Sequence, residues 1–108
     1  MTNPTIFNTV WNAAKQADKY HANRTVQSIF NHAQSEMGEI SIEINIEAGQ
    51  SYKEPGPDGI MGGTLDAIAS LLDIIYKINP NITEAELVQR LQPKMDKWIE
   101  KLEEHQKK

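Results

Sequence analysis

The sequence contains no cysteine, which excludes disulfide bonds, thiolate metal ligands and a cysteine nucleophile, and fits a reducing cytoplasm. Basic residues are also scarce: 11 Lys and Arg stand against 15 Asp and Glu, for a net charge of −4. Nucleic-acid binding is therefore not expected, because such proteins neutralise phosphates with an excess of Lys and Arg. A phosphate-bearing ligand would need a metal ion as its counter-charge.

Segments for export or membrane insertion are also missing. The first residues, Met1-Thr-Asn-Pro-Thr-Ile6, have neither a basic n-region nor an apolar h-region, and no stretch approaches a membrane span. We expect a cytoplasmic protein with no membrane partner. At 108 residues the chain has room for one domain, residues 1–108, with a modest core.

Apolar residues recur at the spacing of helices. This pattern predicts helices over about residues 5–20, from residue 23 or 24 to 48, and up to residue 78. Thr83 and Glu86 form a capping-box pattern that opens a further helix, which Pro93 is expected to kink or split. The tail, residues 103–108, is expected to fray. The sequence thus predicts an all-α bundle of four to five helices.

Glycine and proline gather in one segment, where they make up seven of the fifteen residues 49–63. A loop is expected there, either as a plain connector or as a place where backbone N–H groups approach phosphate. The helix after it is apolar around most of its circumference, so we expect it to be the central one. Its remaining apolar surface predicts a homodimer or homotetramer.

Acidic residues follow one face of each of two predicted helices. At about 100° per residue, a narrow arc of the second helix holds His32, Glu36, Glu39 and Glu43. The polar strip of the third holds Asp66, Ser70, Asp73 and Lys77. Facing carboxylates repel one another unless a cation lies between them, and Mg²⁺, with Mn²⁺ as a substitute, suits oxygen ligands and phosphate chemistry. A solvated or salt-bridged surface is the alternative, including a pair between Asp73 and Lys77.

Two motifs give these acids a family resemblance. Glu36-Met-Gly-Glu39-Ile resembles the E-x-G-E-[LI] motif of MazG-like all-α nucleoside triphosphate pyrophosphohydrolases. Gly56-Pro-Asp-Gly-Ile-Met-Gly62, followed by Leu65-Asp66-Ala67, resembles the loop and third helix of short, phage-type members. The resemblance implies a Mg²⁺-dependent enzyme that converts a (d)NTP and water into a (d)NMP and pyrophosphate, in the host cytoplasm if the protein is viral. Glu36, Glu39 and Asp66 would be the catalytic metal ligands, and Asp73 a further ligand.

The predicted last helix supplies candidate substrate-binding residues. Lys94-Met-Asp-Lys-Trp98 is similar to the basic, Trp-containing end of such chains, so Lys94, Lys97 and Trp98 are predicted to contact the nucleotide. The alternative for the lysines is a solubilising surface. Trp11 and Tyr76 are expected in the core or an interface rather than against a base.

The resemblance fails at one position. The family's third motif is E-x-x-D, and its first acid falls on Gly63, which has no side chain to offer. Asp73, Glu54 or Asp58 are the acids that would compensate. Two other functions stay open: a relative that binds a nucleotide or protein partner without cleavage, and a helical protein whose acids only decorate its surface.

Overall fold

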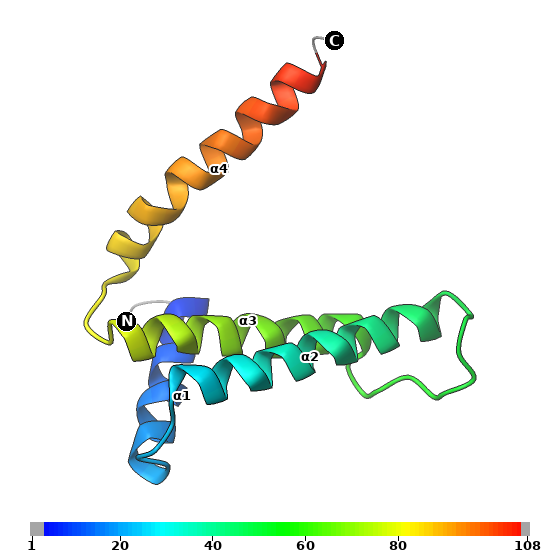
Figure 1. The fold of residues 1–108 in the computed structure, drawn as a ribbon, viewed down its shortest axis with the longest axis horizontal. Helices are drawn as coiled ribbons and strands as arrows, with labels where there is room; N and C mark the ends of the chain where they lie inside the picture. The colour runs from blue at the N-terminus through cyan, green and yellow to red at the C-terminus, as the bar shows by residue number, and fades with distance from the viewer. Residues whose placement is uncertain (1–3, 107–108) are drawn as a thin grey trace.

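The computed structural model describes residues 4–106 as four α-helices, with no strand in that range (Figure 1). They are α1 (Ile6–Tyr20), α2 (Val26–Glu47), α3 (Gly59–Ile78) and α4 (Glu84–Gln106). The predicted all-α class is confirmed, and the number of helices is the lower of the two expected.

Threonine hydroxyls fix the starts of three helices. Thr5 accepts a hydrogen bond from the Asn8 N–H at 3.0 Å, and Thr83 accepts one from the Glu86 N–H at 3.1 Å. At α2 the Thr25 hydroxyl and the Ser28 backbone N–H form half of a reciprocal capping box, and the Ser28 hydroxyl accepts from the Thr25 N–H at 3.0 Å. This cap places the start of α2 two or three residues later than predicted.

The loop between α2 and α3 is shorter than predicted. It comprises residues 48–58, because α3 begins at Gly59 and includes Gly62 and Gly63. Gly59 has a φ of 58°, which favours glycine, and the Gly62 N–H already donates to the Asp58 carbonyl at 3.1 Å. The expected loop over residues 59–63 is therefore wrong: the glycines there are helical.

The core lies where α1 crosses α3. Trp11 stacks on Phe7 with ring centroids 4.1 Å apart, meets Tyr76 edge-on at 5.6 Å, and donates its indole N–H to the Pro80 carbonyl at 3.2 Å. Trp11 and Tyr76 are both buried, so their prediction as core residues is confirmed. A second contact joins α2 to α3 through Ile29, Ala33 and Ala67. As predicted, α3 is central, since it packs against both α1 and α2.

The last helix leaves the other three and diverges from them (Figure 1). It has no buried residue, and it runs unbroken to Gln106 with Pro93 inside, so the predicted split does not occur. Proline removes one backbone hydrogen bond and disfavours the helix, but the neighbouring turns here continue it. Residues 103–106 are helical rather than frayed, and the rest of the predicted tail, residues 107–108, lies outside the described residues.

One helix does reach the length and apolarity of a membrane span. It is α3, so the expectation that no stretch approaches a span is wrong. A central helix of a water-soluble bundle meets the same criterion of length and composition. The composition of α3 therefore favours neither setting.

Candidate carboxylate site

The α2–α3 pair has one acidic side. An open pocket of about 200 Å³ lies between α2, the end of the α2–α3 loop and the first turns of α3. Its acidic lining residues are Glu39, Glu43, Asp58 and Asp66, and glycines 56, 59, 62 and 63 form much of the remaining wall. The structure thus brings together two of the predicted site residues, Glu39 and Asp66, from different helices.

Glu43 is a member of this site to which the sequence analysis gave no role. Its Oε1 accepts a hydrogen bond from the Gly56 N–H at 2.8 Å, and its Oε2 is buried without a partner. A Cβ on Gly56 would lie 2.7 Å from Glu43 Oε1, so glycine permits this close approach. The signal in the sequence was its spacing of one helical turn from Glu39 on the acidic arc.

Glu36 lies one turn before this pocket and does not line it. Its side chain is 12% exposed, and its Oε1 is 3.0 Å from Nε2 of His32, which itself is 67% exposed. The other oxygen, Oε2, is buried without a hydrogen-bond partner. His32 is therefore an exposed side chain that pairs with Glu36 at the edge of the acidic face.

Glu36 and Glu43, two turns apart on α2, each have a buried, unpartnered carboxylate oxygen. Such an oxygen is costly unless a cation or a hydrogen-bond donor reaches it. Oxygen ligands of this kind fit Mg²⁺. Within residues 4–106, however, no three His, Asp or Glu side chains converge closely enough to hold an ion in the conformation shown. Metal binding would require at least three of Glu36, Glu39, Glu43 and Asp66 to turn toward a common point.

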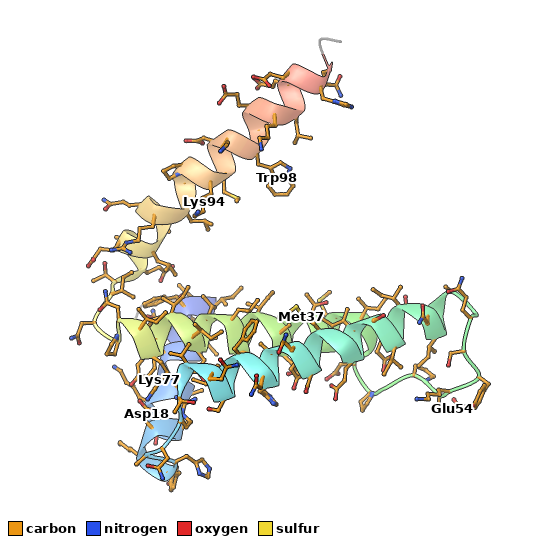
Figure 2. All side chains as sticks on the ribbon, in the orientation of Figure 1. Asp18, Met37, Glu54, Lys77, Lys94 and Trp98 are labelled. Carbon is orange, nitrogen blue, oxygen red and sulfur yellow. The ribbon has the colours of Figure 1, made fainter. Side chains whose placement is uncertain are left out.

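Gly63 has a packing role at the position of the missing acid. A Cβ there would lie 3.1 Å from Cγ1 of Ile40, so the absent side chain allows α2 and α3 to approach closely. Of the acids proposed to compensate, Asp58 lines the pocket. Glu54 is exposed on the α2–α3 loop and is absent from the lining (Figure 2).

Asp73 belongs to a different cluster, at the end of the α2–α3 pair that lies far from the carboxylate pocket. Its carboxylate accepts from both terminal nitrogens of Arg24, one of them at 3.1 Å. Arg24 also donates to Asp18 from Nη2 at 2.8 Å, and Lys77 donates to Asp18 at 3.3 Å. The alternative pair between Asp73 and Lys77 does not form. Arg24 engages both oxygens of Asp73, and the cluster links the segment before α2 to α1 and α3. Asp73 does not line the carboxylate pocket.

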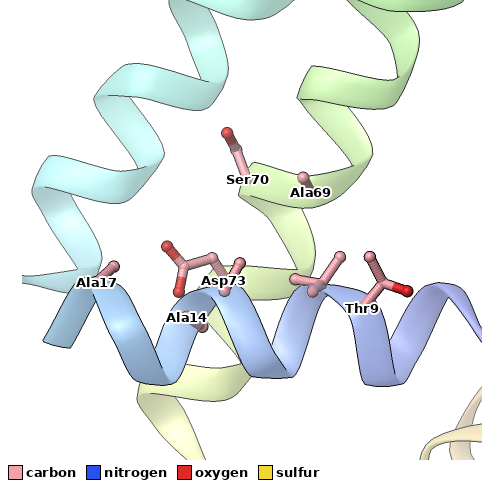
Figure 3. Close-up of a pocket in the computed structure, with 8 residues that line it drawn as sticks. Thr9, Ala14, Ala17, Ala69, Ser70 and Asp73 are labelled. Atoms are coloured by element: carbon pink, nitrogen blue, oxygen red, sulfur yellow. The ribbon is translucent and has the colours of Figure 1, made fainter. Parts of the chain in front are cut away.

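This cluster adjoins a second cavity, of about 310 Å³, between α1 and α3. Figure 3 shows Ala69, Ser70 and Asp73 of α3 beside α1, which contributes Thr9, Ala14 and Ala17. Its walls are mostly alanine and carry one charged group. The cavity therefore offers little to bind a polar ligand.

Ion pairing shifts the titration of the cluster. Burial raises the pKa of Asp18, but hydrogen bonds from Arg24 and Lys77 outweigh it and bring that pKa below its ordinary value of 3.8. The pKa of Arg24 is raised, mainly by its hydrogen bond to Asp73. Burial raises the pKa of Tyr76, and the negative charge of Asp18 adds to the shift.

The predicted substrate-binding residues lie on α4, away from the carboxylates of the same chain. Figure 2 shows Lys94 and Trp98 on the diverging helix, and Trp98 points into the open angle between α4 and the α2–α3 pair. Trp98 is 60% exposed. Within one chain, the structure does not bring Lys94, Lys97 and Trp98 to Glu39 and Asp66.

The described site is therefore a glycine-walled pocket with acids from two helices and the intervening loop, and with no basic residue in its lining. Such a pocket repels a free anion and attracts a cation or a cation-bound phosphate. No protein family model, curated protein or solved structure matches this chain.

Proposed function

We propose that the chain is a MazG-like, homo-oligomeric nucleoside triphosphate pyrophosphohydrolase that depends on Mg²⁺. The observation that supports this most is the shared pocket of Glu39, Glu43 and Asp66, together with buried, unpartnered oxygens on Glu36 and Glu43. The family resemblance rests on Glu36, Glu39 and Asp66. Glu43 adds a fourth carboxylate that the family motif does not include.

In this proposal Glu36, Glu39, Glu43 and Asp66 would hold the metal. When bound there, Mg²⁺ would supply positive charge that polarises a phosphoryl oxygen and makes a water molecule more acidic. The lining of the pocket contains no serine, threonine, cysteine or lysine, so the proposed nucleophile is a water molecule. The water oxygen would bond to the α-phosphorus while the bond from that phosphorus to the α–β bridging oxygen breaks, and pyrophosphate would leave with the bridging oxygen.

Backbone groups of the loop position the carboxylates. The Gly56 N–H holds one oxygen of Glu43 and leaves the other directed into the protein without a partner. On the neighbouring part of α2, Nε2 of His32 lies 3.0 Å from one oxygen of Glu36, and the other oxygen has no partner. Each acid thus has one oxygen near a nitrogen and retains one oxygen for a ligand.

A panel of ribo- and deoxyribonucleoside triphosphates tests this proposal, with pyrophosphate release measured in Mg²⁺ and in Mn²⁺. Glu39→Gln, Glu43→Gln and Asp66→Asn should each lower turnover at least a hundredfold, because each removes a negative ligand oxygen. Glu100→Gln, the same change on the exposed surface of α4, is the matched control and should retain full activity. Unchanged turnover in all three site variants would rule the mechanism out.

The packing of Gly63 against Ile40 favours a second candidate, a relative that binds a nucleotide without cleaving it. In that case the acid position is filled by helix contact, and fewer ligands remain for catalysis. Titration calorimetry with Mg²⁺ and a non-hydrolysable triphosphate distinguishes the two. Binding that disappears in Asp66→Asn, with no pyrophosphate released by the native protein from any triphosphate, would favour the non-catalytic relative.

A further inference from the structure

The α2–α3 pair has a second side, opposite its carboxylates, that is apolar and exposed. On α2 the contact with α3 runs through Ile29, Ala33 and Ile40. At about 100° per residue, the acids lie on one side of this line and the exposed apolar residues on the other. The same division holds on α3 about its contact residues Gly63 and Ala67. We call this surface the apolar face: Val26, Phe30, Met37 and Ile44 of α2 with Ile68, Leu71 and Ile78 of α3, each 37–69% exposed.

The apolar face contains no charge. Its edge on α2 is formed by Gln27, Gln34 and Ser41, and Thr64 lies on the same side of α3. Two identical faces of this kind meet without like-charge repulsion. A nucleic acid or a charged peptide would find no counter-charge there.

The chain exposes more accessible surface than a compact monomeric protein of the same mass does. Its accessible area is 8590 Å², whereas a monomeric protein of its mass exposes about 6,100 Å². The excess of roughly 2,500 Å² is more than the ~800 Å² that each partner buries in a standard interface. The radius of gyration is 17.2 Å, against about 13 Å for a compact domain of this length.

The diverging helix carries a matching apolar row. Spacings of three and four residues align Val88, Leu91, Met95, Trp98 and Leu102 on one side of α4. The start of this row meets its own chain, because Leu91 lines a cavity of about 420 Å³ together with Leu72, Ile75 and Ile78 of α3. The far end of α4 diverges from the other helices (Figure 1). One chain therefore offers an apolar layer and an apolar arm, whose outer residues Trp98 and Leu102 are 60% and 55% exposed.

We infer that the apolar face is the interface between two copies of this chain. The copies pack α2 and α3 against α2 and α3 of the partner about a two-fold axis, and the α4 row of each copy extends the buried surface. Such an isologous interface covers the same patch on both copies at once. The inference specifies the surface of the proposed homo-oligomer and is independent of its reaction, since no residue of the face lines the carboxylate pocket.

Sedimentation equilibrium measures the assembly directly. The native chain should sediment at no less than twice its 12.2 kDa at micromolar concentration. Met37→Glu and Leu71→Glu should each shift it to monomer while circular dichroism shows retained helix, because each places a charge in the interface. Ser35→Glu adds the same charge to the opposite, exposed side of α2 and should leave the assembly unchanged.

Cross-linking keeps the inference testable if a glutamate variant fails to fold. The sequence has no cysteine, so Met37→Cys or Leu71→Cys introduces a single thiol. A short bismaleimide should link copies of these variants and not of Ser35→Cys. A monomeric native chain, an assembly unaffected by both glutamates, or a monomer that binds phosphatidylcholine vesicles through the face would overturn the inference.

Discussion

Arg24 should be the most important single charged residue for stability. It donates to Asp73 and Asp18 and thereby joins the start of α2 to α1 and α3. The three side chains are 15%, 17% and 32% exposed. Charged hydrogen bonds contribute about 1.5–3 kcal/mol, and removing one partner of a fully buried pair costs about 3–5 kcal/mol. Because water reaches these groups in part, we expect Arg24→Met to lower the free energy of unfolding by about 2.5 kcal/mol.

Urea unfolding followed by circular dichroism measures this loss. With an m-value near 1.3 kcal/mol/M, the midpoint should fall by about 2 M without a change in m. Protein concentration must be held fixed, since assembly contributes to apparent stability. Lys15→Met removes an exposed positive charge from α1 and should change stability by less than about 0.5 kcal/mol.

A double-mutant cycle separates the ion pair from other effects. Adding Asp73→Asn to Arg24→Met should cost less than Asp73→Asn alone, because the uncompensated carboxylate is then gone. Arg24→Lys should lose part of the stability, since an ammonium group cannot form the same forked contacts. A loss in Arg24→Met no larger than that in Lys15→Met, or additive effects in the cycle, would refute the role of this cluster.

Three further predictions concern single positions. The lowered pKa of Asp18 means that its contribution is present above pH 3.8 and is lost as pH falls through the lower folded value; Asp18→Asn should therefore flatten the acid limb of a stability–pH profile. Gly38→Ala should stabilise the protein by about 1 kcal/mol, because its Cβ would meet nothing within 4 Å, whereas Gly63→Ala should gain nothing because its Cβ would press on Ile40. Equal gains would contradict this reading. Pro93→Ala should stabilise α4 by up to about 3 kcal/mol, seen as slower amide exchange over residues 84–106.

The helices could be predicted from the sequence because each has a local cause. Thr83 and the 3.6-residue pattern place α4, and the break at Pro80 ends α3. The start of α3 was placed too late because Gly62 and Gly63 are weak helix formers, and only the contact with α2 shows why glycine is needed at position 63.

The site was less predictable than the fold. Glu39 and Asp66 were found because helix periodicity places each on the polar strip of its helix, and both strips border one pocket. Glu43 was given no role, since its bond to Gly56 depends on the path of a loop that periodicity does not describe. Asp73 was assigned to the metal because its partner, Arg24, lies 49 residues away and no local pattern joins them. The direction of α4, and with it the position of Lys94, Lys97 and Trp98, has no local signal in the sequence, since the helix has no buried residue.

The α2–α3 pair has its carboxylate pocket on one side and its apolar face on the other. This arrangement determines how many nucleotides an assembly could bind at once. When two copies join through their apolar faces, their carboxylate pockets lie on opposite outer surfaces of the dimer, each reached from its own side. Occupying one pocket then leaves the entrance of the other open, and the apolar faces between the pockets contain no charged residue. Such a dimer should respond to nucleotide concentration with a hyperbolic curve, as two separate sites do.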